Sequence, residues 1–231
     1  MLTASPKSRV PLSREKPMAP ETKQSRFHLI SSTSFIAGIS LLVLIVLAFP
    51  THAVWADSPT ITSTVPTLSN FSSSIQNGKG KVIRGAYIDG LFALPILQQP
   101  SNNAAFVSTV DNTLTQFGMA SQFGNVGLLA HNYLSGQFFF QLTTGTVIQL
   151  VYGDGRIETY QVTHIYRYQA TSPNSVSSDF IDLDTQKTLT APQLFTKVYK
   201  GPRHVTFQTC ISQDGNSSWG RCFVIAEPIQ P

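Results

Sequence analysis

Two strand-like segments near the C-terminus, joined by a turn-rich loop, constrain this chain more than any other feature. Residues 205–211 alternate β-branched or aromatic side chains with smaller polar ones, and residues 222–226 form an apolar run, so each segment predicts a strand. Residues 212–220 between them have the Gly, Asn and Ser composition of a turn. The stretch therefore predicts an antiparallel hairpin, which would place Cys210 near Arg221 at one end of a sheet.

Cys210 and Arg221 are suited to chemistry if the hairpin brings them together. A neighbouring guanidinium favours the ionised form of a thiol, which is its nucleophilic form. Because side chains alternate faces along a strand, Arg221 and Cys222 should point to opposite sides of the sheet. If Arg221 faces Cys210, then Cys222 does not. A disulfide between the two cysteines is therefore disfavoured, and Cys210 is a candidate nucleophile.

The first 56 residues differ in composition from the rest of the chain. Residues 1–34 form a basic arm rich in Pro and Ser, and the apolar segment 35–56 follows it. That segment ends at Ala56, which fits a cleavage site before Asp57. The pattern predicts a secretory signal or an uncleaved membrane anchor. In either case the excess of Lys and Arg before the apolar run places the remainder outside the cytoplasm, secreted or attached to the membrane.

The net charge of the chain, +4, comes entirely from the basic arm. The arm holds six of the 16 Lys and Arg and two of the 12 Asp and Glu, which leaves ten of each kind in the rest of the chain. The exported part is therefore neutral, and it has no basic stripe interleaved with aromatic residues. No nucleic-acid partner is expected.

The exported part divides into a linker and one domain. Residues 57–80 are rich in Ser, Thr, Asn, Pro and Gly, which is typical of a linker. Residues 81–231 have the length of one domain with a sufficient core, and most of their apolar runs are short and strand-like. The pattern predicts a mainly β fold, a small closed or nearly closed barrel with one or two short helices. The strand-like runs are residues 81–88, 91–97, 127–131, 138–142, 146–152, 157–166, 205–211 and 222–226.

Four local patterns refine this expectation. Residues 102–122 carry apolar residues at helical spacing, which predicts a helix, and residues 191–199 predict a second, shorter one. Pro95 predicts that its strand lies at an edge. The Gly153-Asp154-Gly155 sequence predicts a hairpin turn. The three phenylalanines at 138–140 should alternate faces, so that one exposed ring could line a groove for a peptide.

A cysteine nucleophile that cleaves a peptide bond also needs a proton donor for the departing amine. His204 is on the right face of its strand, but six residues at about 3.3 Å each put it roughly 20 Å from Cys210. His164 lies within an apolar strand, which is typical of a structural histidine. His131 ends a strand and begins a loop, where functional side chains usually project, so it is the candidate.

The order of these residues resembles a known enzyme family. The segment Gly127-Leu128-Leu129-Ala130-His131, the segment Thr206-Phe207-Gln208-Thr209-Cys210 and Arg221 together resemble the sortases, which are cysteine transpeptidases. That family has the pattern Thr-Leu-Xaa-Thr-Cys and the order His, Cys, Arg. The likeness covers about residues 81–231. Phe207 stands where the family usually has Leu, and no subclass can be assigned.

The resemblance implies an eight-stranded sortase-type barrel and an assignment of roles. Cys210 would attack an LPXTG-like sorting signal and carry the acyl fragment as a thioester. His131 would protonate the departing amine and then accept a proton from the incoming one. Arg221 would hold the substrate backbone and stabilise the oxyanion, and Thr209 would help to shape that site. No cofactor and no metal is implied.

The partners implied by the resemblance are exported proteins that end in a sorting signal. The acyl fragment would pass to an amine acceptor, either a wall precursor or a pilin lysine, for cell-surface anchoring or pilus assembly. The membrane would be contacted through the apolar N-terminal segment.

Three other interpretations compete with this one. A catalytically silent exported barrel could bind a peptide or a wall polymer. An L,D-transpeptidase also has His before Cys, but it would need a Ser-His-Gly type segment close before the cysteine, which this sequence lacks. Asp179, Asp182 and Asp184 could bind calcium, yet they lack the Gly and the closing Glu of a calcium loop, so solvated loop carboxylates are favoured.

Overall fold

The computed structural model describes residues 65–175 and 177–229. The predicted basic arm and the predicted apolar segment lie outside these ranges. Within the described ranges, no helix has the length and apolar character that a membrane crossing needs. The helices are α1 (Leu68–Ile75), α2 (Gly118–Ser121), the 3₁₀ helix η1 (Ser135–Gln141) and α3 (Ala191–Tyr199). The strands are β1 (Ile83–Ile88), β2 (Phe92–Gln98), β3 (Leu114–Phe117), β4 (Val126–Leu129), β5 (Val147–Tyr152), β6 (Ile157–Ala170), β7 (Phe180–Asp182), β8 (Thr188–Leu189), β9 (Val205–Gln213) and β10 (Asn216–Pro228).

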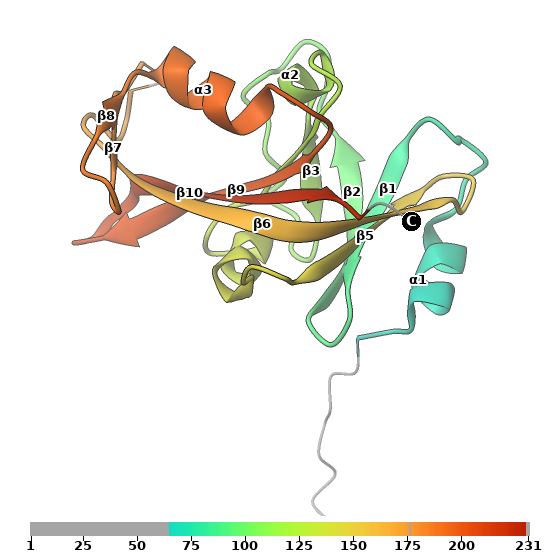
Figure 1. The fold of residues 1–231 in the computed structure, drawn as a ribbon. Coiled ribbons are helices and arrows are strands. Elements are labelled where there is room, and N and C mark those ends of the chain that lie inside the picture. The colour runs from blue at the N-terminus through green and yellow to red at the C-terminus, as the bar shows by residue number, and fades with distance from the viewer. Residues whose placement is uncertain (1–64, 176, 230–231) are drawn as a thin grey trace, which may run out of the picture. The chain divides into compact units, whose positions relative to one another are not determined.

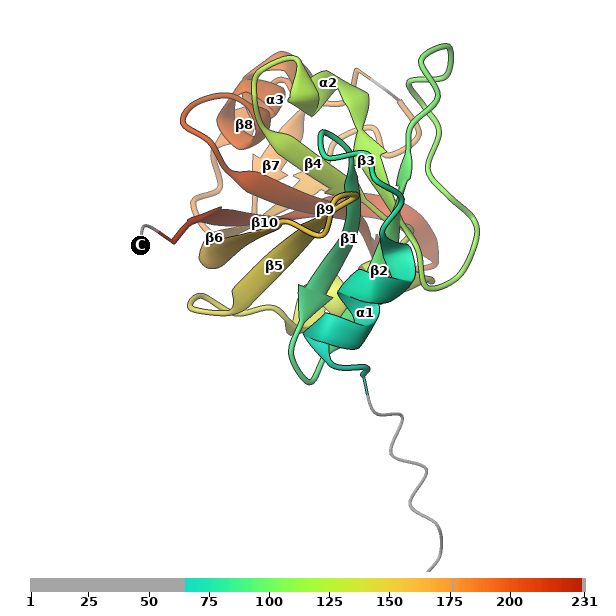
Figure 2. The ribbon, with the colours of Figure 1, turned by 90° about the vertical axis from the view of Figure 1, so that its right-hand side faces the viewer.

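Eight of the strands close into a barrel (Figures 1 and 2). Their order is β10, β9, β4, β3, β2, β1, β5 and β6, and the pairing of β6 with β10 closes the ring. The short strands β7 and β8 extend the sheet from β6 outside this ring. Most pairs are antiparallel, but β4 runs parallel to β9 and β3 runs parallel to β2. The predicted eight-stranded closed barrel with short helices is confirmed.

Alternation along the strands separates two apolar layers. One set of side chains fills the barrel, among them Leu128, Phe207, Cys222 and Val224. The opposite face of β6 and β10 forms a second cluster with α3, which covers this outer face in Figure 1. From Cys222 to Ala226, β10 is therefore buried on both sides, as expected for a strand with a continuous apolar run.

Helix α3 forms where the sequence predicts it, and both of its ends are fixed. Thr190 caps the N-terminus through a capping box with Gln193, which satisfies backbone groups that would otherwise lack partners. At the other end, the Val198 carbonyl accepts hydrogen bonds from the Thr206 hydroxyl (2.5 Å) and from Nε2 of His204 (3.0 Å). These bonds attach the end of the helix to the start of β9.

The predicted helix at residues 102–122 is wrong. Leu114–Phe117 form β3, which pairs with β2 on one side and β4 on the other, and only Gly118–Ser121 are helical. Val110, which should lie on the apolar face of that helix, is 60% exposed. Pairing within the barrel therefore outweighs the helical spacing of the apolar residues.

Two further local predictions are corrected. Strand β2, which contains Pro95, is not an edge, because it lies between β1 and β3. Its pairing with β3 begins at Ile96, one residue after the proline, so the missing N–H is not needed there. The phenylalanines 138–140 lie in η1 and not in a strand; Phe139 is buried and Phe140 is 41% exposed.

The C-terminal part of the expected linker, residues 57–80, is structured. Thr67 caps α1, and its helix packs Phe71 and Ile75 onto the outer face of β1 beside Tyr87. Gly85 lets the helix approach closely, because a Cβ at this position would overlap both the Phe71 and the Ile75 side chains. Figure 2 shows α1 alongside β1 and β2. The folded unit therefore includes this helix.

Candidate active site

The predicted hairpin of β9 and β10 is confirmed, and it pairs Cys210 directly with Arg221. On β9, Cys210 shares a face with Gln208, whose amide oxygen accepts a hydrogen bond from the Tyr199 hydroxyl of α3. On β10, Arg221 shares a face with Phe223, which packs in the cluster under α3. Because alternate residues of a strand share a face, the thiol and the guanidinium lie on the α3 side of the sheet.

Cys222 lies on the opposite side of the same sheet. It pairs with Thr209, it is 1% exposed, and it packs in the barrel core. Burial raises the pKa of Cys222 to about 11. Both cysteines are free, as the opposite-face argument predicts. Only Cys210, which is partly exposed, is placed to meet a substrate.

His131 follows β4, whose parallel pairing with β9 leads toward Cys210. Leu129 pairs with Gln208, and the N–H of Ala130 donates to the Gln208 carbonyl (3.2 Å). The paired positions end at Leu129 and Gln208, and His131 and Cys210 are each two residues further along the chain. Ala130 packs in the barrel core, and His131 begins the turn that leads into η1. The backbone therefore brings His131 near the end of β9 that carries Cys210, whose strand partner on the other side is Arg221.

Thr209 has a different place from the other three predicted residues. It is 2% exposed and faces the barrel, and its hydroxyl donates a hydrogen bond to the carbonyl of Ala130 (2.9 Å). This bond joins the backbone just before His131 to the side chain of the residue just before Cys210. Thr209 therefore supports the site by linking two strands, and its side chain does not lie on the face that carries Cys210.

A close approach of η1 fixes the turn after His131. The His131 carbonyl accepts hydrogen bonds from the N–H groups of Leu134 and Gly136, both at 3.0 Å. A Cβ on Gly136 would lie 2.6 Å from the His131 carbonyl oxygen and would overlap the Thr209 hydroxyl. Only glycine fits at this position without displacing either group.

Hydrogen bonds that the sequence did not reveal hold the side chains of Asn132 and Arg221 against the β9–β10 hairpin. Nδ2 of Asn132 donates to the Ser212 hydroxyl (2.6 Å) and to the Ser217 carbonyl (3.1 Å). Nη1 of Arg221 donates to the carbonyls of Ser218 (2.9 Å) and Gly220 (2.8 Å). The histidine loop and the guanidinium are therefore held by the same irregular start of β10.

A small cavity of about 150 Å³ lies beside Arg221, between α3 and the sheet. Its walls are mainly apolar, with Gln208 and Arg221 as the polar groups; the apolar residues are Phe117, Phe180, Ala191, Leu194, Phe195, Val198, Tyr199 and Phe223. Burial raises the pKa of Tyr199 above its ordinary value, so the phenol stays a neutral hydrogen-bond donor to Gln208. The cavity could accept an apolar side chain of a peptide whose backbone meets the two polar groups.

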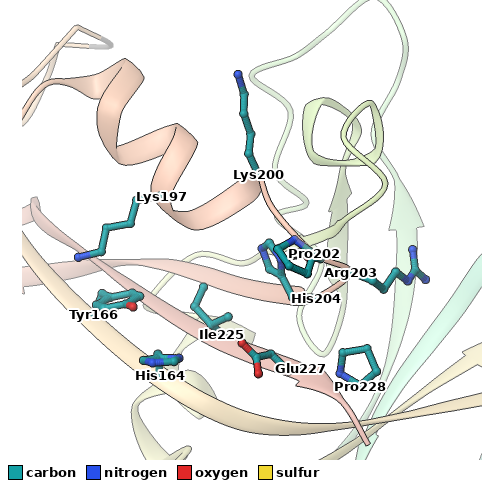
Figure 3. Close-up of a pocket in the computed structure, with 10 residues that line it drawn as sticks. All are labelled: His164, Tyr166, Lys197, Lys200, Pro202, Arg203, His204, Ile225, Glu227 and Pro228. Carbon is teal, nitrogen blue, oxygen red and sulfur yellow. Dashed lines mark hydrogen bonds between the residues drawn. The ribbon is translucent and has the colours of Figure 1, made fainter. Parts of the chain in front are cut away.

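The two histidines that were set aside occupy a different region. His164 is exposed on β6 and stacks on Tyr166, and His204 is buried, with its ring nitrogens near the carbonyls of Val198 and Pro202. Both line a larger cavity of about 500 Å³, shown in Figure 3. In this view the ends of Lys200 and Arg203 point away from the cavity centre. Neither histidine belongs to the Cys210 site.

Of the three loop carboxylates that were expected to be solvated, Asp179 and Asp184 are exposed and Asp182 is not. Asp182 is 5% exposed, accepts the N–H groups of Asp184 and Thr185, and forms an ion pair with Lys197 (3.6 Å). Burial alone would raise the pKa of Asp182, but these hydrogen bonds and Lys197 outweigh it and lower the pKa. In the described part of the chain, no three His, Cys, Asp or Glu residues are grouped to hold a metal ion.

Comparisons with known proteins find similarity only among solved structures. No family model matches the chain, and neither does any curated protein. The sortase A of Corynebacterium diphtheriae is 15% identical with a TM-score of 0.44; the alignment covers 65% of this chain and 61% of the other. The sortase C-1 of Actinomyces oris is 16% identical with a TM-score of 0.44, and the alignment covers 73% of this chain and 84% of the other. The sortase C of Clostridium perfringens SM101 is 16% identical with a TM-score of 0.40, covering 71% and 84%. All three are sortases, the family that the sequence motifs resemble.

Proposed function

We propose that this chain is a sortase-type cysteine transpeptidase that cleaves an LPXTG-like sorting signal and joins the acyl fragment to an amine. The observation that carries the proposal is the direct pairing of Cys210 with Arg221, beside the parallel strand β4, which leads the chain toward His131. A thiol, a cation and an imidazole provide a nucleophile, an oxyanion partner and a proton carrier.

In the first half-reaction, the Cys210 thiolate adds to the carbonyl carbon of the Thr residue, at the peptide bond between Thr and Gly of the signal. The Arg221 guanidinium stabilises the negative charge that develops on the carbonyl oxygen. Because Nη1 of Arg221 is held by backbone carbonyls of its own strand, the guanidinium is oriented before substrate binds. The C–N bond then breaks, His131 gives its proton to the departing amine, and a thioester remains on Cys210.

In the second half-reaction, an amine acceptor replaces the departed fragment. His131 takes a proton from the incoming amine, whose nitrogen forms a bond to the thioester carbon. The C–S bond breaks and Cys210 leaves as thiolate, so the enzyme returns to its starting state. Neither half-reaction transfers electrons, and neither requires a cofactor or a metal ion.

The location and partners follow from the same proposal. Residues 35–56 would hold the chain at the membrane or direct its export, and the barrel would act outside the cytoplasm. Its substrates would be exported proteins with a C-terminal sorting signal. The acceptor amine would come from a wall precursor or from a pilin lysine.

The test is peptide cleavage by the full chain, with hydroxylamine as a simple amine acceptor. A library of peptides based on Leu-Pro-Xaa-Thr-Gly should yield hydroxamate products, and mass spectrometry should find an acyl group on Cys210. Cys210→Ala should abolish both. Cys222→Ala, which removes the other thiol from the opposite face, should retain both and is the matched control. Cleavage by the Cys210→Ala variant at the original rate would refute the assignment.

The second candidate is a silent barrel that binds a peptide or a wall polymer. The mainly apolar cavity beside Arg221 favours it, because such a cavity can bind a side chain without catalysis. If no library peptide is cleaved and no acyl group forms on Cys210, but a peptide still binds in a fluorescence-polarisation assay, the silent barrel is supported and the transpeptidase is rejected.

A further inference from the structure

We propose that Tyr133 is a positioning residue, whose aromatic ring holds the His131 imidazole in the orientation needed for proton transfer. This inference rests on the proposed function of His131. The rings of His131 and Tyr133 stack nearly parallel, with their centroids 5.1 Å apart and their planes inclined by 21°. Only Asn132 lies between the two residues in the sequence, so a single turn places one ring over the other.

The backbone on both sides of His131 is already fixed. Ala130 is bonded to β9 through its N–H and its carbonyl, and the His131 carbonyl accepts two N–H groups of the following turn. The Asn132 side chain attaches the loop to the hairpin. The position of the His131 Cα is therefore set, and only the side-chain torsions remain to be determined.

No hydrogen bond sets those torsions among the residues that the structure describes. In enzymes with a Ser-His-Asp triad, a carboxylate orients the imidazole by bonding one ring nitrogen. Here the ring nitrogens of His131 have no such partner within residues 65–175 and 177–229, and both stay available for proton exchange. The stacked ring of Tyr133 restricts the imidazole while leaving both nitrogens free.

The exposure of Tyr133 argues against a role in the core. The residue is 67% exposed, so burial of its ring contributes little to folding. In the described ranges its hydroxyl also has no hydrogen-bond partner. The ring, and not the hydroxyl, is therefore the part that contributes, and phenylalanine or tryptophan should replace it.

Single-turnover kinetics of the full chain test the proposal with two substrates that share the same acyl part and differ in the leaving group. One is a Leu-Pro-Xaa-Thr-Gly peptide amide, and the other is the thioester of the same acyl part. An amine must be protonated to depart, whereas a thiolate departs without a proton, so only the amide depends on a well-oriented His131. Tyr133→Ala should slow acylation by the amide about three- to tenfold, the range expected for one aromatic stack, and leave the thioester reaction unchanged. Tyr133→Phe and Tyr133→Trp should retain both rates.

Three outcomes separate the possibilities. Equal losses with both substrates would show that Tyr133 binds substrate or supports the fold, and the inference would fall while the proposed function stands. A Tyr133→Phe variant as impaired as Tyr133→Ala would assign the role to the hydroxyl and would also overturn it. Turnover by Cys210→Ala would instead remove the proposed function itself. Thermal unfolding of each variant, expected to match the original chain, shows that any loss is not due to misfolding.

Discussion

Arg221 lies opposite Cys210 in the register of β9 and β10, and the neighbouring Cys222 lies opposite Thr209 on the other face. A single step along β10 therefore separates a partly exposed site from the closed core of the barrel. This relationship gives the two thiols of the chain different chemical environments.

Alkylation should distinguish the two thiols. At neutral pH, iodoacetamide should label Cys210 and leave Cys222 unmodified until the chain unfolds. Cys222 is 1% exposed, and burial raises its pKa to about 11, so only about one molecule in ten thousand would carry a thiolate there at pH 7. Mass spectrometry of tryptic peptides measures both rates. Equal labelling of the two cysteines in the folded chain would contradict the structure.

Arg221→Ala should lower kcat/KM for a cleaved peptide about 100- to 1,000-fold, the cost of losing one oxyanion donor. Arg167→Ala is the matched control, because Arg167 is exposed on β6 and pairs with Cys222 instead of Cys210. It should leave kcat/KM nearly unchanged. Steady-state kinetics measure kcat/KM for both variants. A similar loss of kcat/KM in Arg221→Ala and Arg167→Ala would contradict a specific role of Arg221.

Gly136→Ala should lower both stability and activity. The added methyl group would press on the Thr209 hydroxyl and on the His131 carbonyl oxygen, 2.6 Å away. Relief of that overlap should cost about 1–3 kcal/mol in the free energy of unfolding. At Gly118 a Cβ meets only Oε1 of Gln99 at 3.5 Å, so Gly118→Ala should be tolerated. Urea unfolding compares the two, and equal midpoints would argue against the close approach.

Glu158 should make the stability of the chain depend on acid pH. Burial alone would raise the pKa of Glu158, but hydrogen bonds from Tyr160, Arg203, Tyr152 and Arg156 outweigh it and lower the pKa to about 2. A carboxyl group with a lower pKa in the folded state stabilises the fold fully above its unfolded value and loses this contribution as pH falls. The loss should therefore run from about pH 4.5 down to about pH 2.

Glu158→Gln should remove that part of the pH dependence. We expect it to lower the free energy of unfolding at pH 7 by about 1–2 kcal/mol, a value reduced for partial exposure of the ion pairs. Glu227→Gln is the control, because Glu227 is exposed at the end of β10. Urea midpoints between pH 2 and pH 7 give the comparison. An acid dependence that persists in Glu158→Gln and disappears in Glu227→Gln would reverse the interpretation.

The parts of the fold that sequence could predict are those set by local pattern. The β9–β10 hairpin follows from two alternating runs around a turn, and this pattern also gives the Cys210–Arg221 pair and the separation of Cys222. Helix α3 follows from Pro192, because proline suits the first turn of a helix. In each case the signal and the structure involve the same short segment, so no distant partner is needed.

The features that were not predicted from the sequence depend mainly on contacts between distant segments. Leu114 and Phe117 have helical spacing, yet β2 and β4 supply strand partners on both sides. Helix α1 was hidden in a Ser-rich stretch, although Thr67 followed by Leu68 and Phe71 is a signal for a capped amphipathic helix. The contacts of Asn132 depend on residues 80 or more positions away, and no local pattern specifies them.

The burial of Cys222 inside the barrel has a consequence for the behaviour of the chain toward oxidants. Two sulfurs whose side chains leave a sheet in opposite directions cannot reach each other without moving the backbone. Oxidants such as molecular oxygen therefore cannot inactivate the chain by forming a disulfide between Cys210 and Cys222. Any oxidative damage at Cys210 must come from a small molecule or from a second protein.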